Sequence, residues 1–144
     1  MSALSWAAKK KKLTVLKFLL EKEADINLRD RYDMSSLQIA IKACSCEEAK
    51  YLVDQGAEIN SADWNGMTAL QRATRAGQWD LVQHLLDHGA DVMAPNSGIC
   101  ILHYAVKANK PDIVRLMLIR GADIGQLDKT QRGNLNKMNI FPLH

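Results

Sequence analysis

Two histidines spaced four residues apart, His84 and His88, are the residues most suggestive of chemistry in this sequence. On a helix this spacing stacks both imidazoles on one face, which is how zinc enzymes present a pair of ligands. A metal site needs a third ligand, and none stands at metal-site spacing from the pair along the chain. We therefore predict separate structural roles for His84 and His88, and we expect no metal and no cofactor.

The remaining reactive side chains do not form a recognisable catalytic set. Cys44 and Cys46 are one residue apart and lack a partner pair, so we favour small residues near a turn over a metal or redox site. The sequence offers no Ser/His/Asp arrangement, glycine-rich phosphate loop or pair of carboxylates at a plausible spacing. We predict that the protein is not an enzyme.

The composition is typical of a small intracellular protein. The chain has 144 residues, three cysteines and a formal net charge of +3. Without an apolar leader near Met1 or an apolar run that could span a membrane, we expect a soluble protein of the cytoplasm, the nucleus or both. The charge is too small for a typical nucleic-acid binder. Four lysines at 9–12 form either a solvated basic surface, which we favour, or a nuclear-import signal.

Two sequence markers recur with a spacing of 32 or 33 residues along the chain. The first is a triplet like Gly-Ala-Asp that follows two apolar residues, and its copies begin at Glu23, Gly56, Gly89 and Gly121. The second is a Leu-x-x-Ala pattern in the same phase, and its copies begin at Leu4, Leu37, Leu70 and Leu102. Two independent markers with one period indicate four structural repeats.

Within each repeat the apolar residues fall at helical spacing in two short segments separated by a turn. In the third repeat these segments contain Leu70 and Ala73, then Leu81 and Leu85. A link containing glycine joins one repeat to the next, and Thr68 is placed to cap the helix that follows. A single helix pair leaves apolar surface uncovered on both sides, so the repeats must stack. The predicted fold is an all-α solenoid of helix-turn-helix units.

These motifs resemble those of the ankyrin repeat family. The segment DWNGMTALQRATRAGQWDLVQHLLDHGADV, from Asp63 to Val92, is similar to the family pattern of a hairpin finger and first helix, then a second helix ending in Gly-Ala-Asp. Other repeats depart from the pattern, because the glycine between the two helices is replaced by Lys11, Cys44 and Asn109. These residues must then adopt the turn that glycine makes easily, which asparagine tolerates well.

The resemblance implies a division of the chain into repeats at about 1–29, 30–62, 63–95 and 96–128. The remaining residues, 129–144, then hold an inserted loop and an incomplete fifth repeat that starts at Phe141. We expect the polar insertion, at about 127–138, to be an extended loop. The register also assigns His84 to a mostly apolar slot that faces the neighbouring repeat. It assigns His88 to a polar slot at the end of the second helix, where a cation suits the helix dipole.

Ankyrin repeats bind partners chiefly through the finger tips and the exposed side of the first helices, so the resemblance implies a protein-binding surface there. Trp64 is the strongest candidate anchor, because exposed tryptophan is often a binding hot spot. The alternative is that its ring folds against the neighbouring finger. The full set of candidate finger contacts is Arg31, Tyr32, Met34, Trp64, Asn65, Met67, Asn96 and Ile99.

A cation recurs five residues after each leucine marker. Stacked repeats would align these side chains into a basic stripe, which suits a partner with an acidic segment. The alternative is that each cation only complements the helix dipole at the end of a first helix. The basic stripe consists of Lys9, Lys42, Arg75 and Lys107.

The predicted function is a non-catalytic protein-protein interaction module, acting as an adaptor, scaffold or targeting unit through its concave surface. A regulatory inhibitor that occludes an enzyme or transcription factor is the alternative. We expect a protein partner, no nucleic acid, no membrane insertion, and a monomer unless the truncated ends associate. The resemblance also implies hydroxylation of Asn27 and Asn60 by an asparaginyl hydroxylase, since each follows an acidic-aliphatic pair and lies eight residues after a leucine.

Overall fold

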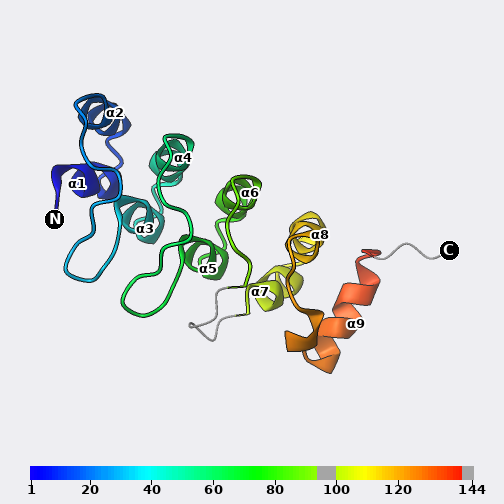
Figure 1. Ribbon diagram of the computed structural model, residues 1–144. Helices are drawn as coiled ribbons and strands as arrows, with labels where there is room; N and C mark the ends of the chain where they lie inside the picture. The colour runs from blue at the N-terminus through cyan, green and yellow to red at the C-terminus, as the bar shows by residue number, and fades with distance from the viewer. Residues whose placement is uncertain (94–99, 141–144) are drawn as a thin grey trace.

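The computed structural model describes residues 1–93 and 100–140. It consists of four helix pairs followed by a short 3-10 turn and a last helix (Figure 1). Within the described residues no strand is formed, and the only β contact is an isolated bridge between Ala62 and Thr68. The helices are α1 (Ala3–Lys9), α2 (Leu13–Glu21), α3 (Ser36–Lys42), α4 (Cys46–Asp54), α5 (Ala69–Arg75), α6 (Trp79–Asp87), α7 (Ile101–Lys107), α8 (Pro111–Ile119), η1 (Ile124–Gln126) and α9 (Lys129–Lys137).

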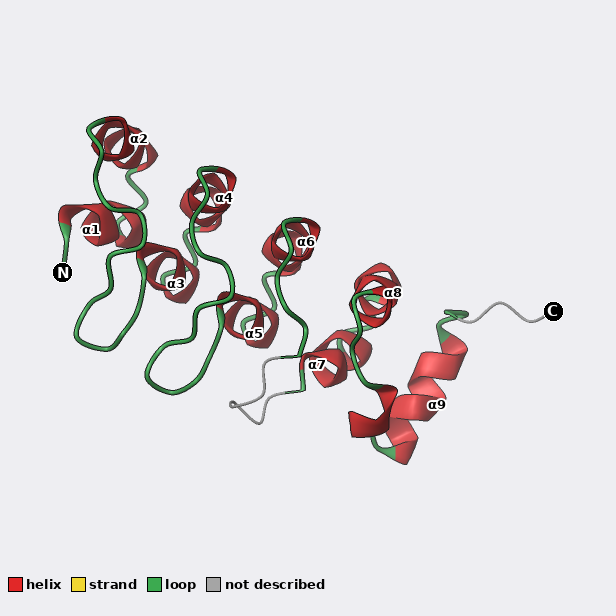
Figure 2. Cartoon of the chain, in the orientation of Figure 1, coloured by secondary structure: helices red, strands yellow, loops and turns green. Residues whose placement is uncertain are grey.

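The helix pairs stack side by side in two rows (Figure 2). The first helices α1, α3, α5 and α7 form one row, and the second helices α2, α4, α6 and α8 form the other, each in contact with its neighbours. The links between repeats extend from the side of the first-helix row. This arrangement confirms the predicted all-α solenoid.

Side-chain caps fix where the first helices α1, α3 and α5 begin, whereas Cys100 gives α7 no side-chain cap. Ser35 Oγ accepts the backbone N–H of Gln38 at 3.3 Å, while Gln38 Oε1 accepts the N–H of Ser35 at 3.1 Å. Thr68 and Gln71 form the same reciprocal capping box at α5. Ser2 caps α1 through its hydroxyl alone. Each cap satisfies N–H groups that the helix itself cannot pair, at a gain of about 1 kcal/mol.

Both rows of helices contribute buried leucines, and the first helices add a recurring position in the register for a small residue. The second helices contribute fully buried leucines such as Leu16, Leu52 and Leu85. The first helices contribute an alanine whose side chain is fully buried, which lets neighbouring backbones approach closely. These alanines are Ala7, Ala40, Ala73 and Ala105. Because each pair is covered only by its neighbours, stacking supplies the core that one repeat lacks.

Glutamine side chains also join the second repeat to the third. Gln38 Nε2 on α3 donates to the carbonyls of Ser61 and Met67 at 3.0 and 3.2 Å. Gln78, which precedes α6, donates from Nε2 to the carbonyl of Ile41 at the end of α3, at 2.9 Å. The bonds to Met67 and Ile41 cross from one repeat to the next, so they add polar contacts to the apolar stacking.

The turn inside each pair requires a left-handed backbone, whatever residue the sequence places there. The φ angles are 59° at Lys11, 58° at Cys44, 72° at Gly77 and 56° at Asn109. This conformation is easy for glycine and costs about 1 to 2 kcal/mol for most other residues. The three departures from glycine therefore keep the turn at some cost in stability.

Replacing Lys11 by glycine is expected to raise the free energy of unfolding by about 0.5 kcal/mol, because relief of the strained φ slightly exceeds the added entropy of the unfolded chain. The reverse change, Gly77→Ala, should lower it by about 1 kcal/mol. A Cβ at Gly77 would meet only Trp79 Nε1 at 3.8 Å, so this cost is conformational rather than steric. Urea denaturation followed by circular dichroism measures both changes, and equal losses in the two variants would contradict this account.

The segment after the fourth pair differs from the expected extended loop, because α9 occupies Lys129–Lys137. Asp128 Oδ1 accepts the N–H of Gln131 at 2.8 Å, and Gln131 Oε1 accepts the N–H of Asp128 at 3.1 Å, forming a capping box. Leu127 and Leu135 are buried, and α9 packs on α7. A cap and two apolar contacts thus outweigh a polar composition. The expected start of a fifth repeat at Phe141 lies outside the described residues.

Candidate functional site

The finger that precedes α5 is held at its base by Asp63. Its Oδ1 accepts the backbone N–H groups of Asn65 and Met67 at 2.9 and 3.1 Å. Its Oδ2 pairs with the guanidinium of Arg72, one turn into α5. The Asp63 side chain is 1% exposed, so these bonds form away from solvent. The carboxylate therefore fixes the conformation of the finger tip relative to the helix.

The finger that precedes α3 repeats this arrangement with one difference. Asp30 Oδ1 accepts the N–H groups of Tyr32 and Met34 at 2.9 and 3.0 Å. The slot of Arg72 is occupied here by Ile39, so the ion pair is missing from this finger. Sequence reasoning did not select either aspartate. The available signal was their identical position in two successive repeats.

Aromatic side chains from the two fingers meet at their tips. The rings of Tyr32 and Trp64 have centroids 5.8 Å apart and are tilted by 48°. The backbone N–H of Trp64 donates to the backbone carbonyl of Tyr32 at 3.3 Å. The guanidinium of Arg31 lies over the Tyr32 ring, 4.9 Å from its centroid. Trp64 nevertheless remains 68% exposed. We call Arg31, Tyr32 and Trp64 the finger-tip cluster.

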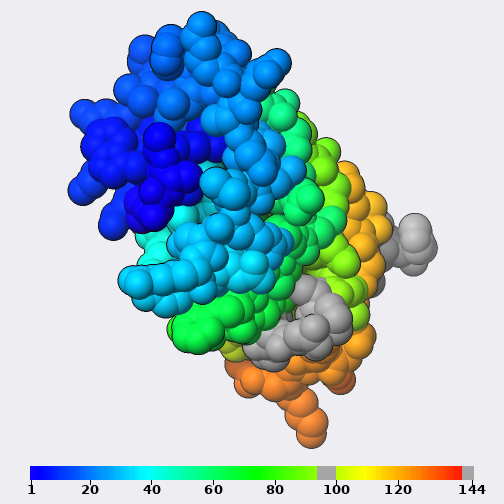
Figure 3. All heavy atoms as spheres, turned by 60° about the vertical axis from the view of Figure 1, so that its left-hand side comes forward, coloured from blue at the N-terminus to red at the C-terminus, as the bar shows by residue number. Residues whose placement is uncertain are grey.

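Both interpretations of Trp64 thus describe part of its environment. The ring leans on the neighbouring finger, as the alternative proposed, and it still presents most of its surface to solvent. Figure 3 shows the light-blue finger before α3 and the green finger before α5 protruding next to each other. An aromatic side chain that is both supported and exposed suits an anchor for a partner.

A pocket of about 360 Å³ lies between the first of these fingers and the helices α1 and α3. Tyr32 and Met34 contribute apolar surface from the finger side, and Lys9 and Lys42 contribute the ends of α1 and α3. Asp30 is also among the lining residues, and its Oδ1 accepts two backbone N–H groups of the finger. One cavity is therefore lined both by residues predicted as finger contacts and by two members of the basic stripe. Ammonium groups beside apolar walls can hold a carboxylate while an apolar side chain is buried next to it.

The basic stripe runs along the first-helix row as expected from the register. Each member is exposed and lies in the last turn of its helix. Among the described residues, none of the four takes part in an ion pair. Without an ion-pair partner, their charged groups remain able to attract an acidic group.

Two of the predicted finger contacts are more buried than a contact surface requires. Met34 is 6% exposed and Met67 is 9% exposed. Each stands just before the residue that caps a first helix, and its backbone N–H is bound by the aspartate at the base of the finger. The expectation of exposed methionines at these slots is wrong. Asn65 is exposed as expected, whereas Asn96 and Ile99 lie outside the described residues.

The asparagines considered for hydroxylation link consecutive repeats. Asn27 Oδ1 accepts the N–H of Glu58 at 2.9 Å, and Asn60 Oδ1 accepts the N–H of Asp91 at 2.7 Å. Both amides thus have a structural role in stacking. Hydroxylation of Asn27 and Asn60 stays a prediction, which the mass of peptides isolated from cells would test.

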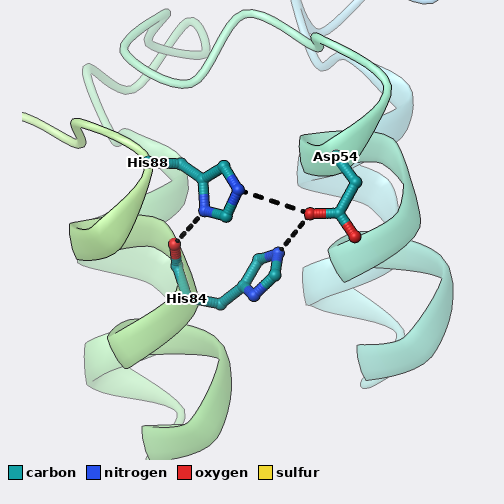
Figure 4. Close-up of side chains that lie close together, drawn as sticks. All are labelled: Asp54, His84 and His88. Atoms are coloured by element: carbon teal, nitrogen blue, oxygen red, sulfur yellow. Dashed lines mark hydrogen bonds and ion pairs between the residues drawn. The ribbon is translucent and has the colours of Figure 1, made fainter.

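The structure overturns the argument that His84 and His88 lack a third potential ligand. Asp54, at the end of α4 in the preceding repeat, approaches both imidazoles of α6 (Figure 4). Its Oδ1 lies 2.8 Å from His84 Nε2 and 3.4 Å from His88 Nε2. Sequence spacing could not reveal this contact, because it depends on how two repeats stack. The slots of His84 and His88 are therefore adjacent in space and share one carboxylate.

The cysteines are free thiols, and Cys46 Sγ donates to Gln78 Oε1 at 3.3 Å. None of the helices in the described part of the chain combines the length and apolarity needed to cross a membrane.

A comparison with curated proteins finds no significant match. A family model described as ankyrin repeats (3 copies) matches residues 1–63 and 60–128, which include all four helix pairs. The chain therefore belongs to the ankyrin-repeat family.

Proposed function

We propose that this chain is an adaptor or scaffold that binds a partner protein through the finger-tip cluster, the pocket beside it and the basic stripe. Ankyrin repeats are generally protein-protein interaction modules and are typically non-catalytic. The observation that carries the proposal is the pocket in which Tyr32 and Met34 meet Lys9 and Lys42. Apolar surface and unneutralised charge at one place support recognition of a specific segment rather than general adhesion.

The chemistry of this surface favours a partner segment that carries carboxylates next to an apolar side chain. The carboxylates would face the ammonium groups of the basic stripe, and the apolar side chain would enter the pocket or pack on Trp64. An extended or helical segment could follow the stripe across several repeats, since its members recur at the same position of each first helix.

The fingers are arranged so that little order has to be gained on binding. Asp30 and Asp63 hold the backbone of their fingers, and the tips of the two fingers support each other through Tyr32 and Trp64. A surface fixed before contact loses less conformational entropy when a partner arrives. This preorganisation supports affinity from a modest contact area.

Selection from a displayed peptide library tests this proposal. The immobilised 144-residue chain is expected to enrich peptides with Asp or Glu near an aromatic or branched apolar residue. Tyr32→Ala should weaken the binding of a selected peptide at least tenfold, because the ring lines the pocket and supports Trp64. Lys129→Glu, an exposed change on α9, is the control and should leave binding unchanged. Enrichment of basic peptides, or binding that is insensitive to Tyr32→Ala, would contradict the proposal.

A further inference from the structure

We propose that Asp54, His84 and His88 form a binding site for Zn²⁺ on the second-helix row, apart from the proposed partner surface. The three side chains come from two repeats, because Asp54 ends α4 while His84 lies on α6 and His88 caps its end. One ligand atom from each lies within 4.8 Å of the others, and Asp54 Oδ1 contacts the Nε2 atoms of both histidines. Two imidazoles and a carboxylate are a ligand set that zinc accepts in proteins.

The distances are close to those that a bound zinc ion would impose. With bonds of about 2.0 to 2.1 Å in a tetrahedral arrangement, ligand atoms lie roughly 3.3 Å apart. His88 Nε2 is already 3.4 Å from Asp54 Oδ1, whereas His84 Nε2 is hydrogen-bonded to the same oxygen at 2.8 Å. The second pair must open by about half an ångström to admit the ion. Because the side chains of Asp54 and His88 are 49% and 39% exposed, this adjustment does not disturb the core.

The orientation of His88 favours coordination through Nε2. Its Nδ1 lies 2.8 Å from the backbone carbonyl of His84. A carbonyl can only accept a hydrogen bond, so Nδ1 must carry the proton, and in the neutral ring the lone pair is then on Nε2. Metal-binding histidines are commonly oriented by such a bond from the ring nitrogen that does not bind the metal. Figure 4 shows this second contact together with the shared carboxylate.

The two rings also face Asp54 from the same side. Their centroids are 4.4 Å apart and their planes differ by 32°, as expected for residues one helical turn apart. The side chain of His84 is 23% exposed, so it forms the more sheltered wall of the site. Three protein ligands on an accessible face leave further coordination positions for water or for a group of another molecule.

Comparison among the repeats indicates that stacking does not require this ligand set. The slot of His84 holds Tyr51 in the second repeat, and the slot of His88 holds Gln55. Carboxylates recur at the slot of Asp54, as Glu21 and Asp87 in the first and third repeats. Only the third repeat places two imidazoles next to such a carboxylate. Imidazole ligands favour Zn²⁺ over Mg²⁺ and Ca²⁺, which prefer oxygen ligands.

Isothermal titration of the metal-free 144-residue chain with zinc chloride tests the site. One zinc ion per chain is expected to bind, and magnesium chloride should give no binding. The double variant His84→Tyr/His88→Gln introduces the residues that the second repeat already holds at these slots, so it should fold while binding zinc at least tenfold more weakly. Asp54→Asn, a single exposed change, should also weaken binding. Failure of the wild-type chain to bind one zinc ion would overturn the proposal.

Two control variants show where the ion binds. His103→Gln removes the histidine on α7, and Cys44→Ser/Cys46→Ser removes the paired thiols; both should keep full zinc binding. Zinc binding that is lost in Cys44→Ser/Cys46→Ser but kept in His84→Tyr/His88→Gln would contradict the site. The zinc site and the proposed partner surface can be tested separately. Lys42→Glu changes the basic stripe and should leave zinc binding unchanged.

Discussion

Replacing Asp63 by alanine is expected to lower the free energy of unfolding by about 3 kcal/mol. The carboxylate accepts two backbone N–H groups and pairs with Arg72, and its side chain is 1% exposed. Alanine removes all three partners at once. Arg72, whose side chain is 19% exposed, then loses its counter-charge in a place where water replaces it incompletely. Urea denaturation followed by circular dichroism measures the loss.

Asp30→Ala is the matched control, because Asp30 accepts the equivalent two N–H groups in the preceding finger without an arginine. This variant is expected to lose about 1 to 2 kcal/mol. The difference between the two variants then measures the contribution of the Arg72 ion pair. Equal losses would mean that the ion pair adds nothing and that the backbone bonds alone hold both fingers.

The double variant Lys42→Glu/Arg75→Glu is expected to bind a selected acidic peptide at least tenfold more weakly than the wild-type chain. Each change replaces an attractive charge with a repulsive one in the middle of the basic stripe. The loss should appear mainly in the association rate constant, since exposed charges at the edge of an interface steer the approach of a partner. Biolayer interferometry at low and high salt measures both the rate and its salt dependence.

This variant also decides between the two interpretations of the stripe. If the cations only complement the dipoles of α3 and α5, the double variant should lose stability and keep its affinity for the peptide. If they attract a partner, the affinity and its salt dependence should fall together. Lys129→Glu makes the same type of charge change on α9 and should alter neither the rate constant nor its salt dependence.

The repeats could be predicted from the sequence because their signals are local and recur in phase. Leu70 and Ala73 mark a first helix and Thr68 marks its start, and the structure confirms both. The turns at Lys11 and Asn109 were predicted because register shows where the glycine belongs. Periodicity averages over several copies, so a departure in one repeat does not hide the fold.

Features that depend on one contact were harder to predict. Asp54 is 30 residues from His84 along the chain, so their contact follows from stacking and not from local spacing. The helix α9 was missed because its composition is polar, although Asp128 and Gln131 form a capping box of the kind that starts other helices here. Met67 was taken as exposed because the family pattern marks its slot as variable. Its burial accompanies the bonds in both directions between Met67 and Asp63, which depend on the folded finger and not on the residue type at the slot.

The glutamine bonds between the second and third repeats also bear on how the array opens. Gln38 donates to the carbonyl of Met67 in the third repeat and Gln78 donates to the carbonyl of Ile41 in the second, so separating the two repeats would break both bonds. The two repeats should therefore lose hydrogen-exchange protection together, as one cooperative unit spanning α3 to α6. The fingers before α3 and α5 are mounted on that unit, so their spacing should persist even while the outer repeats open transiently.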